Sequence, residues 1–381
     1  MKYLYWITLL FLLAFCAEKA ETEKKFVDKF SISFDTVMVD SDGEFIDLRD
    51  NLFFSGLSPD KSYLINFNRT DVESERINLD ELVFEKRIKY EKEGPNGIGT
   101  MISSLNVSDS DQVLVWFYGL YAFFDQNGVK TRDLELDKIA PDQLLGSEVY
   151  PQTIYEDLQN KNRVIGLFFE WKENIYFLVE FDLANRISRK IELPEFAKIN
   201  EYKTEILING NFAGNLGGSV FSTQGPDKLV LSSSVINEIQ IFDLVKDSLF
   251  SKSWETPLLG AKRKYIGPKQ FEYSIEEMED ISKKSEEDIN YGEFIWDEVN
   301  EKFYRFSSKK KLTESKNEEG YYTIMSAEVF LSVFDKELEL IGEALIPEIT
   351  TAPKKHFTKD GKIWIFENID DELAFIRLTF N

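Results

Sequence analysis

The ten residues SPDKSYLINF, from Ser58 to Phe67, are the pattern on which the fold prediction depends. They join a tight polar turn, Pro59-Asp60-Lys61, to a short apolar strand. Turn residues followed by β-branched and aromatic residues are typical of β-hairpins, so this pattern predicts an all-β chain. The pattern occurs six times; the other five turns are Asp111-Gln112, Asn162-Arg163, Pro226-Asp227-Lys228, Asn300-Glu301-Lys302 and Asp360-Gly361-Lys362.

A second repeated feature is an apolar residue followed by Asp at the end of a strand. Its five copies are separated by 45, 57, 61 and 92 residues: Leu79-Asp80, Phe124-Asp125, Phe181-Asp182, Phe242-Asp243 and Phe334-Asp335. A four-stranded unit of this length cannot bury both of its faces alone, and radial stacking of such units gives a β-propeller. We therefore predict a six-bladed β-propeller over residues 26–381. A pair of β-sandwiches and an irregular β-solenoid are the alternatives.

The two ends of this repeat complement each other. The chain ends after the strand ELAFIRLTF (372–380), so the sixth unit lacks its outer strand. A spare strand, KFSISFDTVMVD (29–40), precedes the first unit. We predict that the spare strand pairs with the last unit and closes the ring, which would remove an open sheet edge.

The N-terminus indicates export. Residues 3–15 are apolar except for Thr8, too short a run to span a membrane as a helix but typical of a signal peptide. The run ends in Leu13-Ala14-Phe15-Cys16, which resembles a bacterial lipobox, although Phe15 departs from the small residue usual before the cysteine. We expect a signal peptide over 1–16, lipidation of Cys16, a polar linker over 17–25 and an outer-membrane lipoprotein. Ordinary secretion to the periplasm, with cleavage after Cys16, is the alternative.

Composition excludes several classes of function. The 381 residues carry a net charge of −23, which disfavours nucleic acid and anionic membrane surfaces as partners. We therefore expect membrane contact only through the lipid anchor. One cysteine and one histidine exclude a disulfide framework and a multi-histidine metal site. The acidic segment DSDGE (40–44) lacks the spaced ligands of a full Ca²⁺ loop, so we predict a turn there, with no metal and no cofactor.

Residues 256–290, between the fourth and fifth units, break the repeat. They include SIEEMEDISKKSEED (274–288), in which Ser274 and Glu277 have the spacing of a helix capping box. Ile275, Met278 and Ile281 would form a narrow apolar stripe on this charged helix. The segment is predicted to be a solvated helical insertion on the surface or, alternatively, a lid over the channel.

The predicted binding surface is the face formed by the connections between blades. Eight of the ten prolines, Pro151 among them, fall in these connections, as does the Gly/Asn-rich segment NGNFAGNLGG (209–218). Trp171 and Trp296 fall near hairpin tips and are candidates for stacking on sugar rings, with ordinary packing as the alternative. The candidate binding residues offer amides, a phenol and basic groups: Asn96, Tyr150, Gln152, Asn211, Asn215, Lys355 and His356. The alternative for His356 is an exposed surface residue without a role.

The turn Ser58-Pro59-Asp60-Lys61 resembles the SPDGK turn of TolB-type propellers. The segments EGPNGIG (93–99), VLVWFY (113–118) and YAFFDQNGVK (121–130) resemble blades of six-bladed propeller lipoproteins of Bacteroidota. DTVMVDSDGEFIDL (35–48) is similar to the start of an uncharacterised subfamily of these lipoproteins, a domain of unknown function. The resemblance implies an envelope lipoprotein with a propeller fold and supplies no catalytic residues.

Two functions remain open from the sequence. The first is a non-catalytic envelope module that binds a peptide, a glycan or a partner protein on the face of the blade-to-blade connections. The second is a propeller hydrolase or lyase that uses channel carboxylates, with or without Ca²⁺. The scarcity of histidine and cysteine favours the first, because general bases that work near neutral pH are most often histidines.

Overall fold

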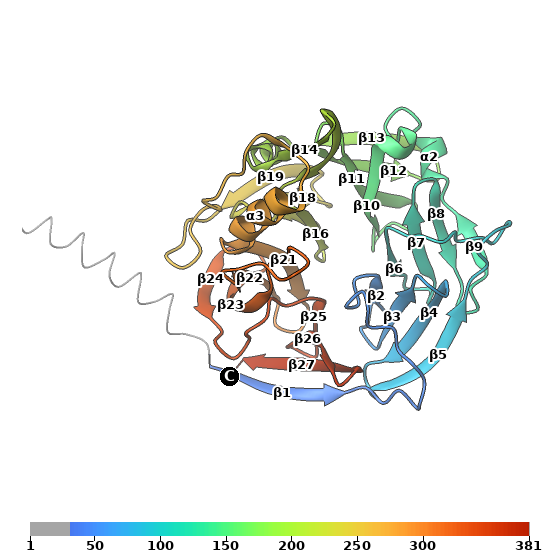
Figure 1. Cartoon of the computed structure of the whole chain (residues 1–381). Coiled ribbons are helices and arrows are strands. Elements are labelled where there is room, and N and C mark those ends of the chain that lie inside the picture. The colour runs from blue at the N-terminus through green and yellow to red at the C-terminus, as the bar shows by residue number, and fades with distance from the viewer. Residues whose placement is uncertain (1–30, 381) are drawn as a thin grey trace, which may run out of the picture.

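The computed structural model describes residues 31–380 (Figure 1). The predicted signal peptide, Cys16 and the linker of residues 17–25 lie outside the described residues. Within them the chain is mostly β, with six four-stranded antiparallel sheets and one three-stranded sheet. The described part contains no helix that is both long enough and apolar enough to cross a membrane.

The first three four-stranded sheets are each built from consecutive strands. Sheet 1 contains β2 (Ser55–Leu57), β3 (Tyr63–Asn68), β4 (Glu73–Asn78) and β5 (Val83–Lys89). Sheet 2 contains β6 (Ser104–Val107), β7 (Val113–Phe117), β8 (Leu120–Phe124) and β9 (Lys130–Asp133). Sheet 3 contains β10 (Val149–Glu156), β11 (Arg163–Glu170), β12 (Ile175–Asp182) and β13 (Ile187–Glu192).

The other three four-stranded sheets are also built from consecutive strands, except that the last one includes β1 from the start of the described chain. Sheet 4 contains β16 (Val220–Gln224), β17 (Lys228–Ser233), β18 (Glu238–Asp243) and β19 (Ser248–Ser253). Sheet 5 contains β21 (Asn290–Asp297), β22 (Lys302–Leu312), β23 (Ile324–Asp335) and β24 (Leu340–Leu345). Sheet 6 contains β25 (His356–Lys359), β26 (Lys362–Ile369), β27 (Glu372–Phe380) and β1 (Ile32–Met38).

The remaining elements lie in the connections between sheets. Short helical turns α2 (Leu136–Ile139), η1 (Gly146–Glu148) and η2 (Pro194–Tyr202) flank sheet 3. The small sheet contains β14 (Thr204–Ile208), β15 (Asn211–Leu216) and β20 (Gln270–Glu272), and helix α3 (Ile275–Glu286) follows β20.

Both repeated turn patterns lie where the sequence predicts them. Each of the six polar turns joins the first and second strands of a four-stranded sheet, and each of the five Asp motifs follows or ends a third strand. The aspartate side chain stabilises the second kind of turn. For example, Asp243 Oδ1 accepts hydrogen bonds from the backbone N–H groups of Val245 at 3.0 Å and Lys246 at 2.7 Å. The segment 40–44 is also a turn, as predicted, with Asp40 Oδ1 accepting from Asp42 N at 2.9 Å.

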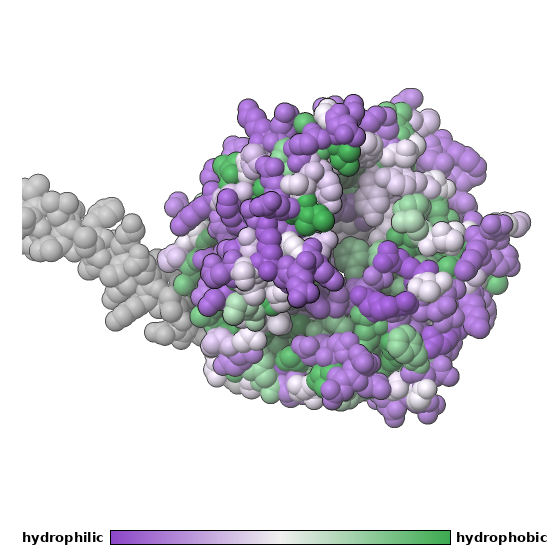
Figure 2. All heavy atoms as spheres, in the orientation of Figure 1, coloured by the Kyte–Doolittle hydropathy of each residue, from purple (hydrophilic) through white to green (hydrophobic). Residues whose placement is uncertain are grey.

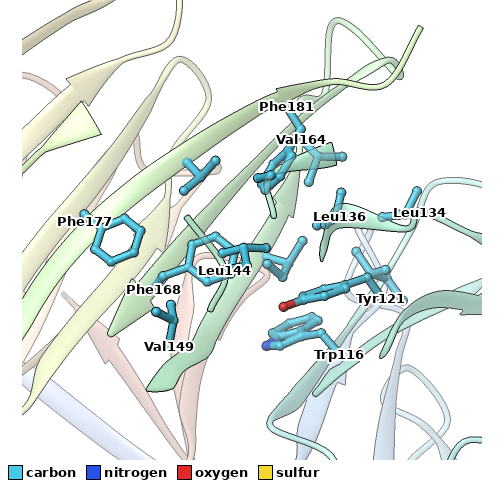
Figure 3. Close-up of a cluster of buried hydrophobic side chains, with 14 of the residues drawn as sticks. Trp116, Tyr121, Leu134, Leu136, Leu144, Val149, Val164, Phe168, Phe177 and Phe181 are labelled. Carbon is cyan, nitrogen blue, oxygen red and sulfur yellow. The ribbon is translucent and has the colours of Figure 1, made fainter. Parts of the chain in front are cut away.

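Six hydrophobic clusters join neighbouring sheets in turn. One lies between sheets 2 and 3, where Trp116 and Tyr121 face Phe168 and Phe177 (Figure 3). The others join sheets 1 and 2, 3 and 4, 4 and 5, 5 and 6, and 6 and 1. The sheets therefore follow one another around a central axis, as Figure 1 shows, and not as two facing sheets.

The predicted pairing of the chain's ends is confirmed. Strand β1 pairs antiparallel with β27 over its whole length, from Ile32 opposite Phe380 to Met38 opposite Ala374. The Arg377 guanidinium donates to the Asp35 carboxylate across the same pair. Strand β1 thus occupies the outer position of sheet 6, which the C-terminal strand leaves open.

The connections between sheets differ from the prediction in two respects. The segment 209–218, expected in a connection, contains the turn and the second strand of a β14–β15 hairpin. Strand β20 of the insertion pairs with β14 in parallel. Two connections thus combine in one small sheet. Pro151 lies inside β10, not before it, at a shift of register that accommodates the missing N–H group.

The predicted helix of the insertion is present, and the Ser274 hydroxyl accepts from Glu277 N at 3.2 Å. The apolar stripe is only partly used, because Ile281 is buried while Ile275 is exposed. Helix α3 lies against β22 and forms one wall of a cavity described below.

Ring closure makes a prediction about Phe34 of β1, which is half-buried against the cluster between sheets 5 and 6. Phe34→Ala should lower the free energy of unfolding by about 1–3 kcal/mol, because a large apolar side chain is lost from a packed site. Ser33→Ala, on the exposed face of the same strand, should change it by less than about 0.5 kcal/mol. Urea unfolding monitored by fluorescence measures both, and equal midpoints for the two variants would contradict the closure.

Candidate functional site

The first strands of the six sheets surround a cavity of about 950 Å³. We call it the wide cavity. Its wall includes one residue or more from, or directly before, the first strand of every four-stranded sheet: Ser55, Ser104, Tyr150, Val220, Glu293 and Lys355. Figure 2 shows a recess near the centre of this face, with hydrophobic side chains at its margin.

A second cavity of about 500 Å³, the axial cavity, continues along the same strands. It shares Asn106, Ser222, Glu293 and Lys355 with the wide cavity, so the two lie end to end near the ring axis. The axial cavity reaches the polar turns between first and second strands, because its wall includes Pro59 and Pro226.

The structure brings together most of the predicted binding residues. Tyr150, Gln152, Asn215 and Lys355 line the wide cavity, while Lys355 and His356 line the axial cavity. His356 is buried, at 7% exposed, which corrects the alternative of an exposed surface residue.

Two predicted residues lie elsewhere. Asn211 is exposed on β15, where its amide donates to the Asn209 carbonyl at 3.1 Å, and it lines neither cavity. Asn96, in the connection from sheet 1 to sheet 2, also lies outside both cavities. Of the two tryptophans, Trp171 lines the wide cavity and Trp296 the axial cavity.

Aromatic rings form much of the wall of the wide cavity. Trp171, at the tip of the β11–β12 hairpin, stacks on Phe212 with ring centroids 5.8 Å apart. Phe169 and Tyr176, opposite each other on the same hairpin, stack at 4.4 Å. Phe169 and Tyr176 were not among the predicted binding residues, although the run FFEWKENIYF (168–177) places aromatic residues on both sides of a hairpin tip.

Hydrogen bonds fix several of these side chains. The Trp171 indole N–H donates to the Ser147 carbonyl at 3.0 Å, which holds the ring in place. The Asn215 amide donates to the Trp171 carbonyl at 3.3 Å, and Asn215 Oδ1 is buried without a hydrogen-bond partner in the described structure. A buried acceptor of this kind is costly unless a ligand or water satisfies it.

The charges at the wide cavity are mixed. Lys355 Nζ donates to the Ser55 carbonyl at 3.1 Å, and Lys354 Nζ donates to Asn51 Oδ1 at 2.6 Å. Burial lowers the pKa of Lys355, and the nearby Glu293 carboxylate opposes that shift. The cavity therefore holds a partly desolvated ammonium group in a protein of strongly negative net charge.

The axial cavity carries the carboxylates of Glu156 and Glu293. Burial raises the pKa of Glu156 above its ordinary value. Among residues 31–380, no three His, Cys, Asp or Glu side chains are grouped so as to hold a metal ion.

The lowered pKa of Lys355 predicts a pH dependence of stability. Between the folded-state pKa and the ordinary value of 10.5, the unfolded chain binds more protons, so the stability of the wild type rises with pH there. The stability of Lys355→Met relative to the wild type should therefore fall as pH rises toward 10.5. Lys354→Met, at the neighbouring residue, is the control and should show the wild-type slope. Parallel slopes for wild type and Lys355→Met in denaturant titrations would contradict the desolvation of Lys355.

Comparisons with known proteins identify the family. The chain matches a crystal structure of a DUF4221 family member from Bacteroides vulgatus with a TM-score of 0.65 and 17% identity, covering 93% of this chain and 99% of that one. It also matches a putative exported protein from Bacteroides fragilis with a TM-score of 0.53 and 8% identity, covering 94% and 98%. No curated protein matches it. The family model described as "Domain of unknown function (DUF4221)" matches residues 28–345, so the chain belongs to the DUF4221 family.

Proposed function

We propose that this chain is a six-bladed β-propeller that binds a glycan in the wide cavity. The propeller assignment is supported by six four-stranded sheets, by the six clusters between neighbouring sheets, and by the pairing of β1 with β27. In such an architecture the first strand of each blade lines the axis, where residues distant in sequence form one site.

One observation carries the functional proposal: five first strands, and the residues directly before the sixth, contribute to a single cavity walled by aromatic rings and amides. A pocket formed by apolar and aromatic walls with a few convergent polar groups is the usual form of a ligand site. The hairpin tip that carries Trp171 is fixed by hydrogen bonds, so the aromatic surface is formed before a ligand arrives.

A sugar suits this wall better than a purely apolar ligand. A pyranose ring offers an apolar face that stacks on an aromatic ring, and its hydroxyl groups donate hydrogen bonds. Trp171 and Tyr150 supply half-buried rings, and Asn215 Oδ1 supplies a buried acceptor without a partner in the described structure. Lys355 would in addition attract an anionic substituent on the ligand.

The proposed location is the cell envelope, with Cys16 as a lipid anchor. The putative exported protein of Bacteroides fragilis shares the fold, which supports export. The apolar run before Cys16 and the polar residues after it support a lipoprotein over a freely soluble periplasmic protein.

Binding can be tested by affinity electrophoresis in gels that each contain one polysaccharide. We expect at least one polysaccharide to retard the wild type. Trp171→Ala and Tyr150→Ala should each weaken the retardation about tenfold or more. The reason is that stacking of a base on an aromatic ring contributes ~1–3 kcal/mol, and stacking of a sugar on such a ring should be comparable. Phe250→Ala is the control, because Phe250 lies 44% exposed on the outer strand β19. Its variant should be retarded like the wild type.

Three results would count against the proposal. Equal retardation of Trp171→Ala, Tyr150→Ala and wild type would place binding elsewhere. Binding of peptides from a random library, with no polysaccharide retained, would indicate a peptide module. Release of reducing ends over time, abolished by Glu156→Gln, would favour the rival hydrolase or lyase that uses the carboxylates of the axial cavity.

A further inference from the structure

A third cavity of about 360 Å³ lies between helix α3 and the first strands of sheets 4, 5 and 6. We call it the helix cavity. It adjoins the wide cavity, since Leu216, Gly217, Ser219 and Phe221 line both. Its volume is at the small end of the range for ligand sites and would hold about one sugar ring.

Two residues that line the helix cavity each have a buried polar atom without a hydrogen-bond partner in the described structure. The two atoms are Nε2 of His356, a residue 7% exposed, and Oγ of Ser307, a residue 2% exposed. Native structures rarely leave such groups unpaired, and where the residue lines a cavity a water or a ligand can supply the partner. The two atoms come from different sheets, 6 and 5, so the site exists only in the assembled ring.

The hydrogen bond of His356 Nδ1, on the other side of the imidazole ring, determines whether Nε2 donates or accepts a hydrogen bond. His356 Nδ1 lies 2.7 Å from the Lys354 carbonyl oxygen. A carbonyl only accepts, so Nδ1 carries the proton, and Nε2 of the neutral ring is an acceptor. The edge-to-face contact with Phe306, at 5.2 Å between centroids, holds the ring in this orientation. A ligand hydroxyl is therefore the natural donor to Nε2.

The charges around the helix cavity favour an acidic ligand. Its wall contains the basic residues Arg263 and Lys310 and the acidic residue Glu286, which pairs with Lys310 at 2.5 Å. Arg263 is 5% exposed, and its Nε donates to the Ile289 carbonyl at 3.3 Å while its Nη2 donates to Asn290 Oδ1. Arg263 forms no salt bridge among the described residues, although the Asp288 and Glu286 carboxylates lie near enough to favour its charged form. The wall of the helix cavity nevertheless contains one more basic than acidic side chain.

We propose that the helix cavity binds an acidic monosaccharide unit at the end of the glycan, an inference that rests on the proposed function. The carboxylate of the sugar lies on the Arg263 side, where the wall is basic. A ring hydroxyl donates to His356 Nε2, and Ser307 Oγ pairs with a second hydroxyl. The helix cavity thus recognises the terminal sugar unit, while the wide cavity binds the rest of the glycan by stacking.

The test compares glucuronate with glucose by ligand-observed NMR, because the two sugars differ only in the carboxylate. Glucuronate should bind about tenfold tighter than glucose, as expected for a charge-assisted hydrogen bond. His356→Phe keeps an aromatic ring against Phe306 but removes Nε2, and Ser307→Ala removes one hydroxyl; each should weaken glucuronate binding about fivefold or more. Phe250→Ala, on the outer strand β19, should leave it unchanged, and thermal melting checks that each variant folds.

Several outcomes would overturn the inference. Equal binding of glucose and glucuronate would show that the carboxylate of the sugar does not contribute to binding. Competition by sulfate at the same concentration would indicate a simple anion site. Unchanged binding in both Ser307→Ala and His356→Phe would place the sugar elsewhere, as would its loss in Phe250→Ala. If a polysaccharide still retards the wild type in a Trp171-dependent manner, only the inference fails; if none does, the proposed function fails.

Discussion

The pairing of β1 with β27 is the interaction on which the rest of the structure depends. Seven residues of the first strand complete the sheet of the last one, and the cluster between sheets 6 and 1 completes the cycle of packed interfaces. Without β1, sheet 6 would expose an unpaired edge and part of the apolar surface that Phe34 covers. The closed cycle also fixes the positions of the six first strands, and these strands form the wide and axial cavities. Stability and the proposed site therefore have the same structural origin.

The distribution of charge follows from this arrangement. The outer strands are the most exposed, as in β13 and β19, and the second strands, such as β11 and β17, are largely buried. Most of the excess acidic residues can therefore face water. The half-buried Lys355 and the buried Arg263 lie at the cavities instead, where desolvation lowers the pKa of both. The helix cavity thus has one more basic than acidic side chain in a protein of strongly negative net charge, and this contrast favours an acidic terminal unit.

The sequence predicts the local and repeated features well. The polar turns, the Asp motifs, the capped helix and the pairing of the two ends all depend on short patterns or on a regular period. The small sheet was not predicted. Strands β14 and β20 are about 65 residues apart, belong to no repeated pattern in the sequence, and pair in parallel.

The burial of His356 was also not predicted. Its segment, Pro353-Lys354-Lys355-His356, is polar, and the contacts that bury it come from Phe306 and from other remote segments. Asn96 and Asn211 were predicted to bind because they lie in connections between sheets. That position in the sequence does not determine how far a residue lies from the central axis.

A crystal structure of the protein with a glucuronate-terminated oligosaccharide tests the central claim most directly. We predict density for sugar rings stacked on Trp171 in the wide cavity, with the terminal acidic unit beside His356 and Ser307 in the helix cavity. Sugar bound on the outer strands, or at the polar turns on the opposite face, would contradict the assignment of the binding site to the meeting point of the six first strands.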